Sequence, residues 1–261
     1  MGPWRAHHIR EGEPYEVSNG HLLYCLPNDG PRSRAHSAAA GVLSAAAPHP
    51  YCALLDAGFT WSRGRYLRAP NLAVGSVDSE DPGWVVIPPQ LALEYTDDRK
   101  DEHYLPCKLA ELFELGTRLI WVVHLTGPLR VEIHEPGTPP RIVEADDMLA
   151  APGILAGAFP VRALIDPEVA RKAVLHFLLA KKGYPSLEAV REEGRQQGLA
   201  EARHEIRVAQ GRTLLRSQLA ARGWTLPTPL DARITACTDL PTLMRWLIQV
   251  AVAADVEAAL R

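Results

Sequence analysis

"LALEYTDD", residues 91–98, is the stretch that decides the predicted fold. Apolar residues run almost unbroken from Gln90 to Thr96, as in a strand buried on both faces. One carboxylate, that of Glu94, stands inside this run near its end. A buried carboxylate is costly unless a cation or hydrogen bonds compensate its charge. Glu94 is therefore a metal ligand at a strand end, the partner of an arginine, or an exposed strand-end residue.

The patterns around this strand predict an α/β sandwich built on a mixed sheet. Asn19-Gly20 is a strong hairpin signal. Gly116 is a natural C-cap for a helix predicted over the residues that precede it. Helices are predicted over about residues 33–47 and 104–115. The other predicted strands lie in "PYEVSNGHLLYCL", "FTWSRGRYLRAPNLAVGSV", "LIWVVHL", "LRVEIHE" and, as an edge strand, "RIVEADD".

The sequence shows no further strand patterns after about residue 167, and only helix patterns follow. Asp166 is a plausible N-cap with Pro167 at the first helical position. Ser186 to about Arg222 reads as one long polar helix, and shorter amphipathic helices complete the chain. We therefore predict a first domain over residues 1–166 and a helical region over 167–261, with a linker near 181–186.

Bulk composition restricts the class of protein. The chain has 261 residues, and its net charge of -3 divides into -7 over residues 1–166 (14 basic, 21 acidic) and +4 over 167–261 (14 basic, 10 acidic). The net negative charge of the first domain does not attract nucleic acid, so any binding of DNA requires local basic patches. Four widely spaced cysteines, the lack of a signal-peptide pattern and the lack of a long apolar run predict a cytoplasmic protein without a membrane span.

Lys108 lies on the helix that follows the Glu94 strand. A helix packed back on the sheet could aim this lysine at the Glu94 end. Hydrolysis of phosphodiesters needs carboxylates that hold Mg²⁺ and a cation that stabilises the developing charge. The alternative is a surface lysine with its stem along apolar residues, the commoner fate of a single lysine.

Five segments stand in the order and approximate spacing of the Uma2 family, which this chain resembles over about residues 12–166. They are "PYEVSNGHLL", "RAHSAAAGVL", "YLRAPNLAV", "LALEYTDD" and "KLAELFELGTRLIWVV". Uma2 proteins are restriction-endonuclease-like, so the resemblance implies a PD-(D/E)XK nuclease core with a mixed central sheet flanked by helices. It also implies Mg²⁺ or Mn²⁺ as cofactor and DNA as substrate.

The resemblance assigns roles residue by residue. Glu16 matches the family's early glutamate, His36 the histidine of the first helix, Glu94 the strand glutamate and Lys108 the lysine supplied by the following helix. Asn71 departs from the pattern, because it stands after Pro70 where the family has a metal-binding aspartate. Asparagine offers a carbonyl oxygen to a hard cation, but no charge. The site is therefore predicted to be weakened or inactive.

If the alignment is shifted, Asp78 or Asp97 supplies the missing charge instead. A neighbouring acidic stretch, "DDRKDEH" at residues 97–103, reads as a loop and helix start, where carboxylates suit the helix dipole. The histidines show no zinc-ligand spacing, and there is no phosphate-binding or dinucleotide-binding glycine motif.

"WSRGRYLR", residues 61–68, is the candidate nucleic-acid contact. It interleaves Arg63, Arg65 and Arg68 with aromatic side chains, as a hairpin that touches phosphates does. His36 joins these residues as a further candidate contact. The alternative is an ordinary solvated hairpin.

The C-terminal region resembles the helices that follow Rpn-type transposase/nuclease domains, most clearly in "ITACTDLPTLMRWL". A long charged helix with few apolar positions buries little by itself, so residues 187–261 are predicted to serve self-association or a protein partner, unless they form a lid on the chain's own core. Two functions remain open: a metal-dependent DNA endonuclease weakened at Asn71, and an inactive nuclease-fold module that acts in assembly or DNA binding.

Overall fold

The computed structural model describes residues 3–76, 83–97 and 104–261, which divide into two compact units, Met1–Gly183 and Tyr184–Arg261. Asp78 and most of the "DDRKDEH" stretch lie outside the described residues. No helix in the described part of the chain is long and apolar enough to span a membrane.

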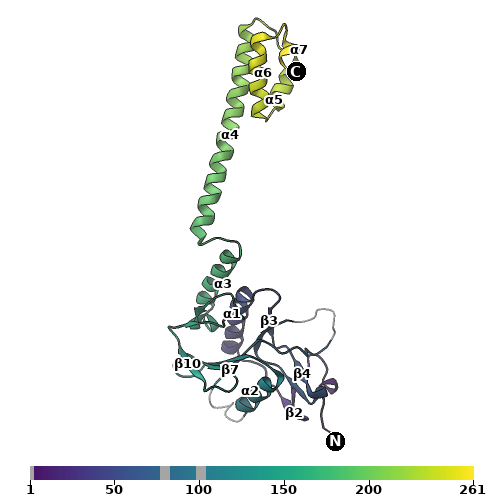
Figure 1. The fold of residues 1–261 in the computed structure, drawn as a ribbon, viewed down its shortest axis with the longest axis vertical. Coiled ribbons are helices and arrows are strands. Elements are labelled where there is room, and N and C mark those ends of the chain that lie inside the picture. Colours follow the sequence, from purple (N-terminus) through teal and green to yellow (C-terminus); the bar gives the residue numbers. More distant parts are fainter. Residues whose placement is uncertain (1–2, 77–82, 98–103) are drawn as a thin grey trace. The chain divides into compact units, whose positions relative to one another are not determined.

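A six-stranded mixed sheet forms the centre of the first unit (Figure 1). Only the central pair, β7 and β8, is parallel, and every residue of these two strands is buried. The predicted burial of the Glu94 strand on both faces is therefore confirmed. In sheet order the strands are β10 (Arg141–Glu144), β9 (Arg130–His134), β8 (Leu119–His124), β7 (Leu91–Thr96), β6 (Leu72–Gly75) and β3 (Cys52–Leu55).

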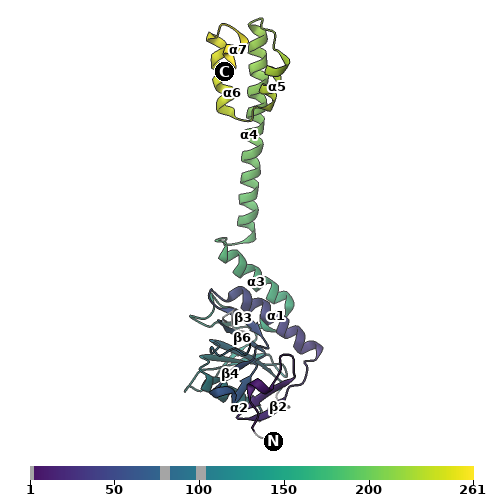
Figure 2. The ribbon, with the colours of Figure 1, turned by 90° about the vertical axis from the view of Figure 1, so that its right-hand side faces the viewer.

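Helices cover the two faces of this sheet. Alanine-rich α1 (Gly30–Ala46) packs with α3 (Pro167–Lys181) over the face that carries Leu91 and Leu93, and Figure 2 shows the two helices side by side. α2 (Tyr104–Leu115) packs its leucines on the opposite face, against Ala92, Ile120 and Val122. The predicted α/β fold with a mixed central sheet and flanking helices is confirmed.

A second, four-stranded sheet lies in the order β2 (His21–Tyr24), β1 (Tyr15–Ser18), β5 (Tyr66–Arg68) and β4 (Phe59–Trp61). Its first hairpin turns at Asn19-Gly20, where both residues have positive φ, as predicted. This sheet carries Glu16 and Arg68 to the α2 side of the molecule. Short elements complete the unit: β11 (Met148–Leu149), β12 (Phe159–Pro160) and the 3-10 helices η1 (Ala6–His8), η2 (Ser62–Gly64) and η3 (Val161–Leu164).

The predicted domain boundary at residue 167 lies one helix too early. Asp166 caps α3, as expected, by accepting from the Glu168 and Val169 N–H groups. However, Ala170, Ala173 and Phe177 of α3 belong to the apolar core of the first unit. The division therefore falls at Gly183/Tyr184, inside the predicted linker of residues 181–186.

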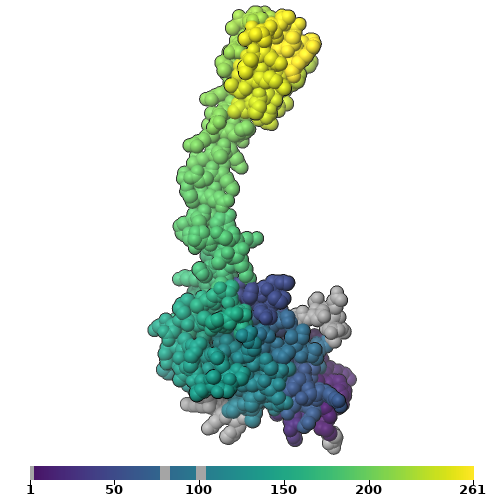
Figure 3. Space-filling model, in the orientation of Figure 1, coloured from purple at the N-terminus to yellow at the C-terminus, as the bar shows by residue number. Residues whose placement is uncertain are grey.

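The second unit is wholly helical, as predicted. It consists of α4 (Leu187–Ala221), α5 (Thr228–Ala236), α6 (Leu240–Val252) and α7 (Val256–Ala259). α5 to α7 gather around the C-terminal part of α4, where Leu215 and Leu219 of α4 and Leu243 of α6 belong to one buried apolar cluster. The first half of α4 carries almost only exposed side chains, and Figure 3 shows this stretch bare of the other three helices.

Candidate functional site

Glu94 lies in the fourth position of β7, on the face that α2 covers. Its side chain is buried, and its Oε1 atom lies 2.8 Å from Lys108 Nζ. This oxygen has no well-aligned hydrogen bond, so the contact with Lys108 is an ion pair. Burial raises the pKa of Glu94 to about 7, and the Lys108 cation opposes this rise. Of the three readings of Glu94, the exposed one is wrong, because the residue is only 4% exposed.

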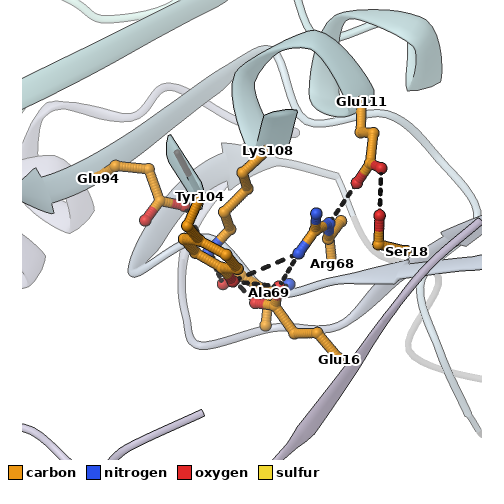
Figure 4. A network of polar contacts seen from close by, with 8 residues as sticks. All are labelled: Glu16, Ser18, Arg68, Ala69, Glu94, Tyr104, Lys108 and Glu111. Atoms are coloured by element: carbon orange, nitrogen blue, oxygen red, sulfur yellow. Dashed lines mark hydrogen bonds and ion pairs between the residues drawn. The ribbon is translucent and has the colours of Figure 1, made fainter. Parts of the chain in front are cut away.

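Lys108 points from α2 into the site and not along the surface. Its Nζ lies 3.2 Å from Glu16 Oε1 and donates to the Ala69 carbonyl at 2.8 Å (Figure 4). The residue is 3% exposed. Burial lowers its pKa, but the carboxylates of Glu16 and Glu94 outweigh burial and raise the pKa above its usual range. The prediction that α2 aims this lysine at Glu94 is confirmed.

Glu16 of β1 is the most fully bonded carboxylate in this site. Its Oε2 accepts from Arg68 Nη1 and from the Tyr104 hydroxyl, each at 2.7 Å. Its Oε1 accepts from the Ala69 N–H at 3.1 Å and lies within ion-pair distance of Lys108. Burial raises its pKa, yet the cations and hydrogen bonds together lower it. Four protein donors thus match the roughly four lone-pair sites of a carboxylate.

Arg68 is a member of this site and not a surface contact for phosphates. It is 1% exposed, and its guanidinium pairs with Glu16 and with Glu111 of α2 (Figure 4). Glu111 also accepts from the Ser18 hydroxyl. The expected role of Arg68 in nucleic-acid contact is therefore wrong, because two carboxylates draw its side chain inward. The interleaved arginine and aromatic residues of "WSRGRYLR" gave no sign that Arg68 differs from Arg63 and Arg65.

The other predicted contacts separate into two groups. Arg63 and Arg65 are exposed at the η2 turn, and the Arg65 guanidinium donates to Asn19 Oδ1. His36 is buried and stacks on Tyr95, with ring centroids 4.7 Å apart. Burial lowers the pKa of His36 to about 4, so the ring is neutral at pH 7. A buried neutral ring does not match the expected contact with DNA.

Asn71 lies at the edge of the cluster with its side chain already engaged. Its Oδ1 accepts from the Tyr95 N–H at 2.9 Å, across from β7. The structure thus brings Glu16, Glu94 and Lys108 together as predicted, and Asn71, which directly precedes β6, bonds to the residue after Glu94. Asp97, the proposed substitute, follows the last residue of β7.

Asp56 is a site residue that sequence reasoning missed. It follows β3, and its N–H donates to the Asn71 carbonyl at 3.3 Å, in continuation of the β3–β6 pairing. Its φ of 48° is unusual for a residue with a Cβ. Its side chain is exposed; partial desolvation raises its pKa, while Lys108 lowers it. No local motif marks this aspartate, because only the pairing of β3 with β6 brings it beside Asn71.

Mg²⁺ does not fit this arrangement of donors. Magnesium needs free carboxylate or carbonyl oxygens at about 2.0–2.1 Å, but protein donors occupy Glu16 and the Asn71 Oδ1 atom. Across residues 3–76, 83–97 and 104–261, no group of three or more His, Cys, Asp or Glu side chains is arranged to hold a metal ion. The cations of Lys108 and Arg68 compensate the buried carboxylates instead.

Comparison with known proteins shows which solved fold this chain is similar to. No family model matches the chain, and no curated protein matches it. A solved structure that does match is the crystal structure of "a putative nuclease belonging to DUF820" from Anabaena variabilis. The TM-score is 0.54 at 16% sequence identity, and the match covers 64% of this chain and 99% of that chain. The chain therefore has a nuclease-like fold.

Proposed function

We propose that this chain is a DNA endonuclease of the Uma2 type whose metal-dependent site is weakened or inactivated at Asn71. The observation that carries the proposal is the position of Lys108 Nζ, 2.8 Å from Glu94 and 3.2 Å from Glu16 inside a buried cluster. Carboxylates around a lysine on the α2 side of a nuclease-like sheet are the residues that phosphodiester hydrolysis requires. The similarity in fold to a DUF820 nuclease supports this choice of chemistry.

Asn71 explains why the site is disarmed. An aspartate at this position, directly before the neighbouring strand β6, would add one negative charge at the Glu94 end of β7. At 4 Å and an effective dielectric constant of 20, a unit charge pair is worth about 4 kcal/mol. The natural chain lacks this attraction for a divalent cation, and Lys108 and Arg68 already form ion pairs with the carboxylates that remain.

A second candidate function is an inactive nuclease-fold module that acts in assembly or DNA binding. Complete occupation of the Glu16 oxygens by protein donors favours it, because this carboxylate is satisfied without any cation from solvent. Its partner contacts would come from residues 187–261, where α4 and α6 expose apolar side chains.

Cleavage assays distinguish the two functions. Plasmid and single-stranded DNA would be incubated in Mg²⁺ or Mn²⁺ with the natural chain, Asn71→Asp and the double variant Asn71→Asp/Glu94→Ala. We expect little or no cleavage by the natural chain, a clear gain with Asn71→Asp, and loss in the double variant. Glu114→Ala removes an exposed carboxylate of α2 and is the matched control.

Each other outcome has a definite meaning. Strong cleavage by the natural chain that Glu94→Ala abolishes would show a working nuclease and contradict the weakening at Asn71. If no variant cleaves DNA although all the proteins are folded, this result would contradict the endonuclease proposal and favour the inactive module.

A further inference from the structure

A cavity of about 470 Å³ lies beside the carboxylate-lysine cluster, on the same face of the central sheet. Thr96 and His124, the last residues of the parallel strands β7 and β8, line it. Ligands of open α/β sheets commonly bind outside the carboxyl ends of such strands. None of the residues assigned to the nuclease-like site lines this cavity.

One wall of the cavity is apolar and comes from α2. Leu105, Leu109 and Phe113 form it, and Val122 of β8 continues it onto the sheet. Because these residues alternate around α2 with Tyr104, Lys108 and Glu111, the same helix serves the charged cluster on one side and the cavity on the other. A cavity of this size with one apolar wall suits the flat ring system of a small ligand.

The opposite wall is polar and comes from β8 and β9. Glu132 lies between two imidazoles, with Oε1 2.9 Å from His124 Nε2 and Oε2 3.2 Å from His134 Nε2. Arg130 Nη2 lies 3.0 Å from His124 Nδ1. A guanidinium can only donate, so Nδ1 accepts and the proton of a neutral His124 is on Nε2. The ring therefore donates to Glu132 and fixes its carboxylate.

These contacts define what the cavity can recognise. Each carboxylate oxygen has about two lone-pair sites, and the imidazoles use one site on each oxygen of Glu132. The remaining sites suit two adjacent N–H donors in a forked, charge-assisted pair. Guanine combines a flat apolar ring face with two such donors, its ring N–H and its amino group.

We propose that the cavity between α2 and the Glu132 carboxylate binds a guanine base. The choice of a nucleobase rests on the proposed nuclease-like function, since enzymes that act on unpaired nucleotides hold a base by stacking and by hydrogen bonds to its edge. The polar wall follows from the sequence of β9, in which every second residue is polar. These residues lie on one face of the strand and are Arg130, Glu132 and His134.

The test compares GMP with IMP, which has the same phosphate and ring but lacks the amino group. Binding to the full chain would be measured by isothermal titration calorimetry without divalent metal. We expect GMP to bind about tenfold more tightly than IMP, the effect of one charge-assisted hydrogen bond. Glu132→Gln should abolish the preference, whereas Glu135→Gln, which removes an exposed neighbouring carboxylate, should keep it.

A second variant tests the location. Ala110 is exposed and lines the cavity, so Ala110→Trp should block GMP without disturbing the core. Equal binding of GMP and IMP, a preference that survives Glu132→Gln, or unchanged binding in Ala110→Trp would overturn the proposal. So would no binding of GMP at millimolar concentration, or binding of an arginine derivative in its place.

This outcome is separable from that of the cleavage assays. Calorimetry needs neither metal nor Glu94, so a preference for GMP in the Glu94→Ala variant would support the cavity even if no variant cleaves DNA. Restored cleavage in Asn71→Asp together with no GMP preference would leave the nuclease proposal standing and remove the guanine site.

Discussion

Lys108 Nζ lies 2.8 Å from Glu94 Oε1 and completes a buried cluster in which each charged side chain has an opposite charge beside it. The lysine comes from α2 and the glutamate from β7. Since β7 and β8 are parallel, the chain must cross over between them, and α2 is that crossover. The crossover therefore returns Lys108 to the strand that carries Glu94.

Removal of the Lys108 cation should destabilise the first unit strongly. In Lys108→Met the carboxylates of Glu16 and Glu94 stay buried without their shared partner. Breaking a buried pair in this way typically costs about 3–5 kcal/mol. Urea unfolding of the natural chain and the variant measures the difference. Lys172→Met, on the exposed side of α3, is the matched control and should change little. Equal stability of the two variants would contradict the importance of the cluster.

The stability of the chain should fall with rising pH through the range in which Glu94 titrates. Burial raises the pKa of Glu94 from 4.5 in the unfolded chain to about 7 in the folded one. The folded state therefore holds this proton more tightly, and its contribution is full below pH 4.5 and lost as pH rises through 7. The shift corresponds to about 3 kcal/mol.

The measurement compares the unfolding free energy of the natural chain with that of Glu94→Gln at several pH values. The glutamine variant cannot titrate at this position, and the contributions of other groups cancel in the difference. A difference that stays constant between pH 4.5 and 8 would show that Lys108, and not burial, sets the pKa of Glu94.

Arg68 and Arg65 should respond in opposite ways to substitution. Arg68→Lys removes the planar fork that contacts Glu16 and Glu111, so we expect a loss of about 2 kcal/mol in unfolding free energy. Arg65→Lys, on the exposed turn, should stay within about 0.5 kcal/mol. Thermal and urea unfolding give both values. If the two variants were equally stable, the contacts of Arg68 would contribute nothing net.

Deletion of the C-terminal unit should leave the first unit folded and reduce self-association. Residues 1–183 contain the whole core of the central sheet, including α3. The second unit exposes apolar side chains at Ile206 of α4 and at Met244, Ile248 and Val252 of α6, and exposed apolar stripes commonly mark interfaces. Light scattering of both proteins tests this expectation. A full chain that is monomeric at high concentration would contradict self-association and leave only a foreign partner.

The elements of the fold followed from local patterns in the sequence. Alternating or continuous apolar residues marked β7 to β10, Asn19-Gly20 marked the first hairpin, and Asp166-Pro167 marked the start of α3. These signals depend only on backbone preferences and on burial of one face, and both are properties of neighbouring residues. The approach of Lys108 to Glu94 was also predicted from the sequence, because the ordered set of motifs pairs the strand glutamate with a lysine of the following helix.

Tertiary structure alone decided which further residues join the site of Glu16, Glu94 and Lys108. Arg63, Arg65 and Arg68 look alike in the sequence, yet only Arg68 is buried, because Glu16 and Glu111 arrive from two remote elements to pair with it. Asp56 joins Asn71 through strand pairing, and α3 joins the first unit by packing on α1, which ends over 120 residues earlier in the chain. The free energy of a buried charge depends on partners brought by the whole fold, so no local pattern could reveal it.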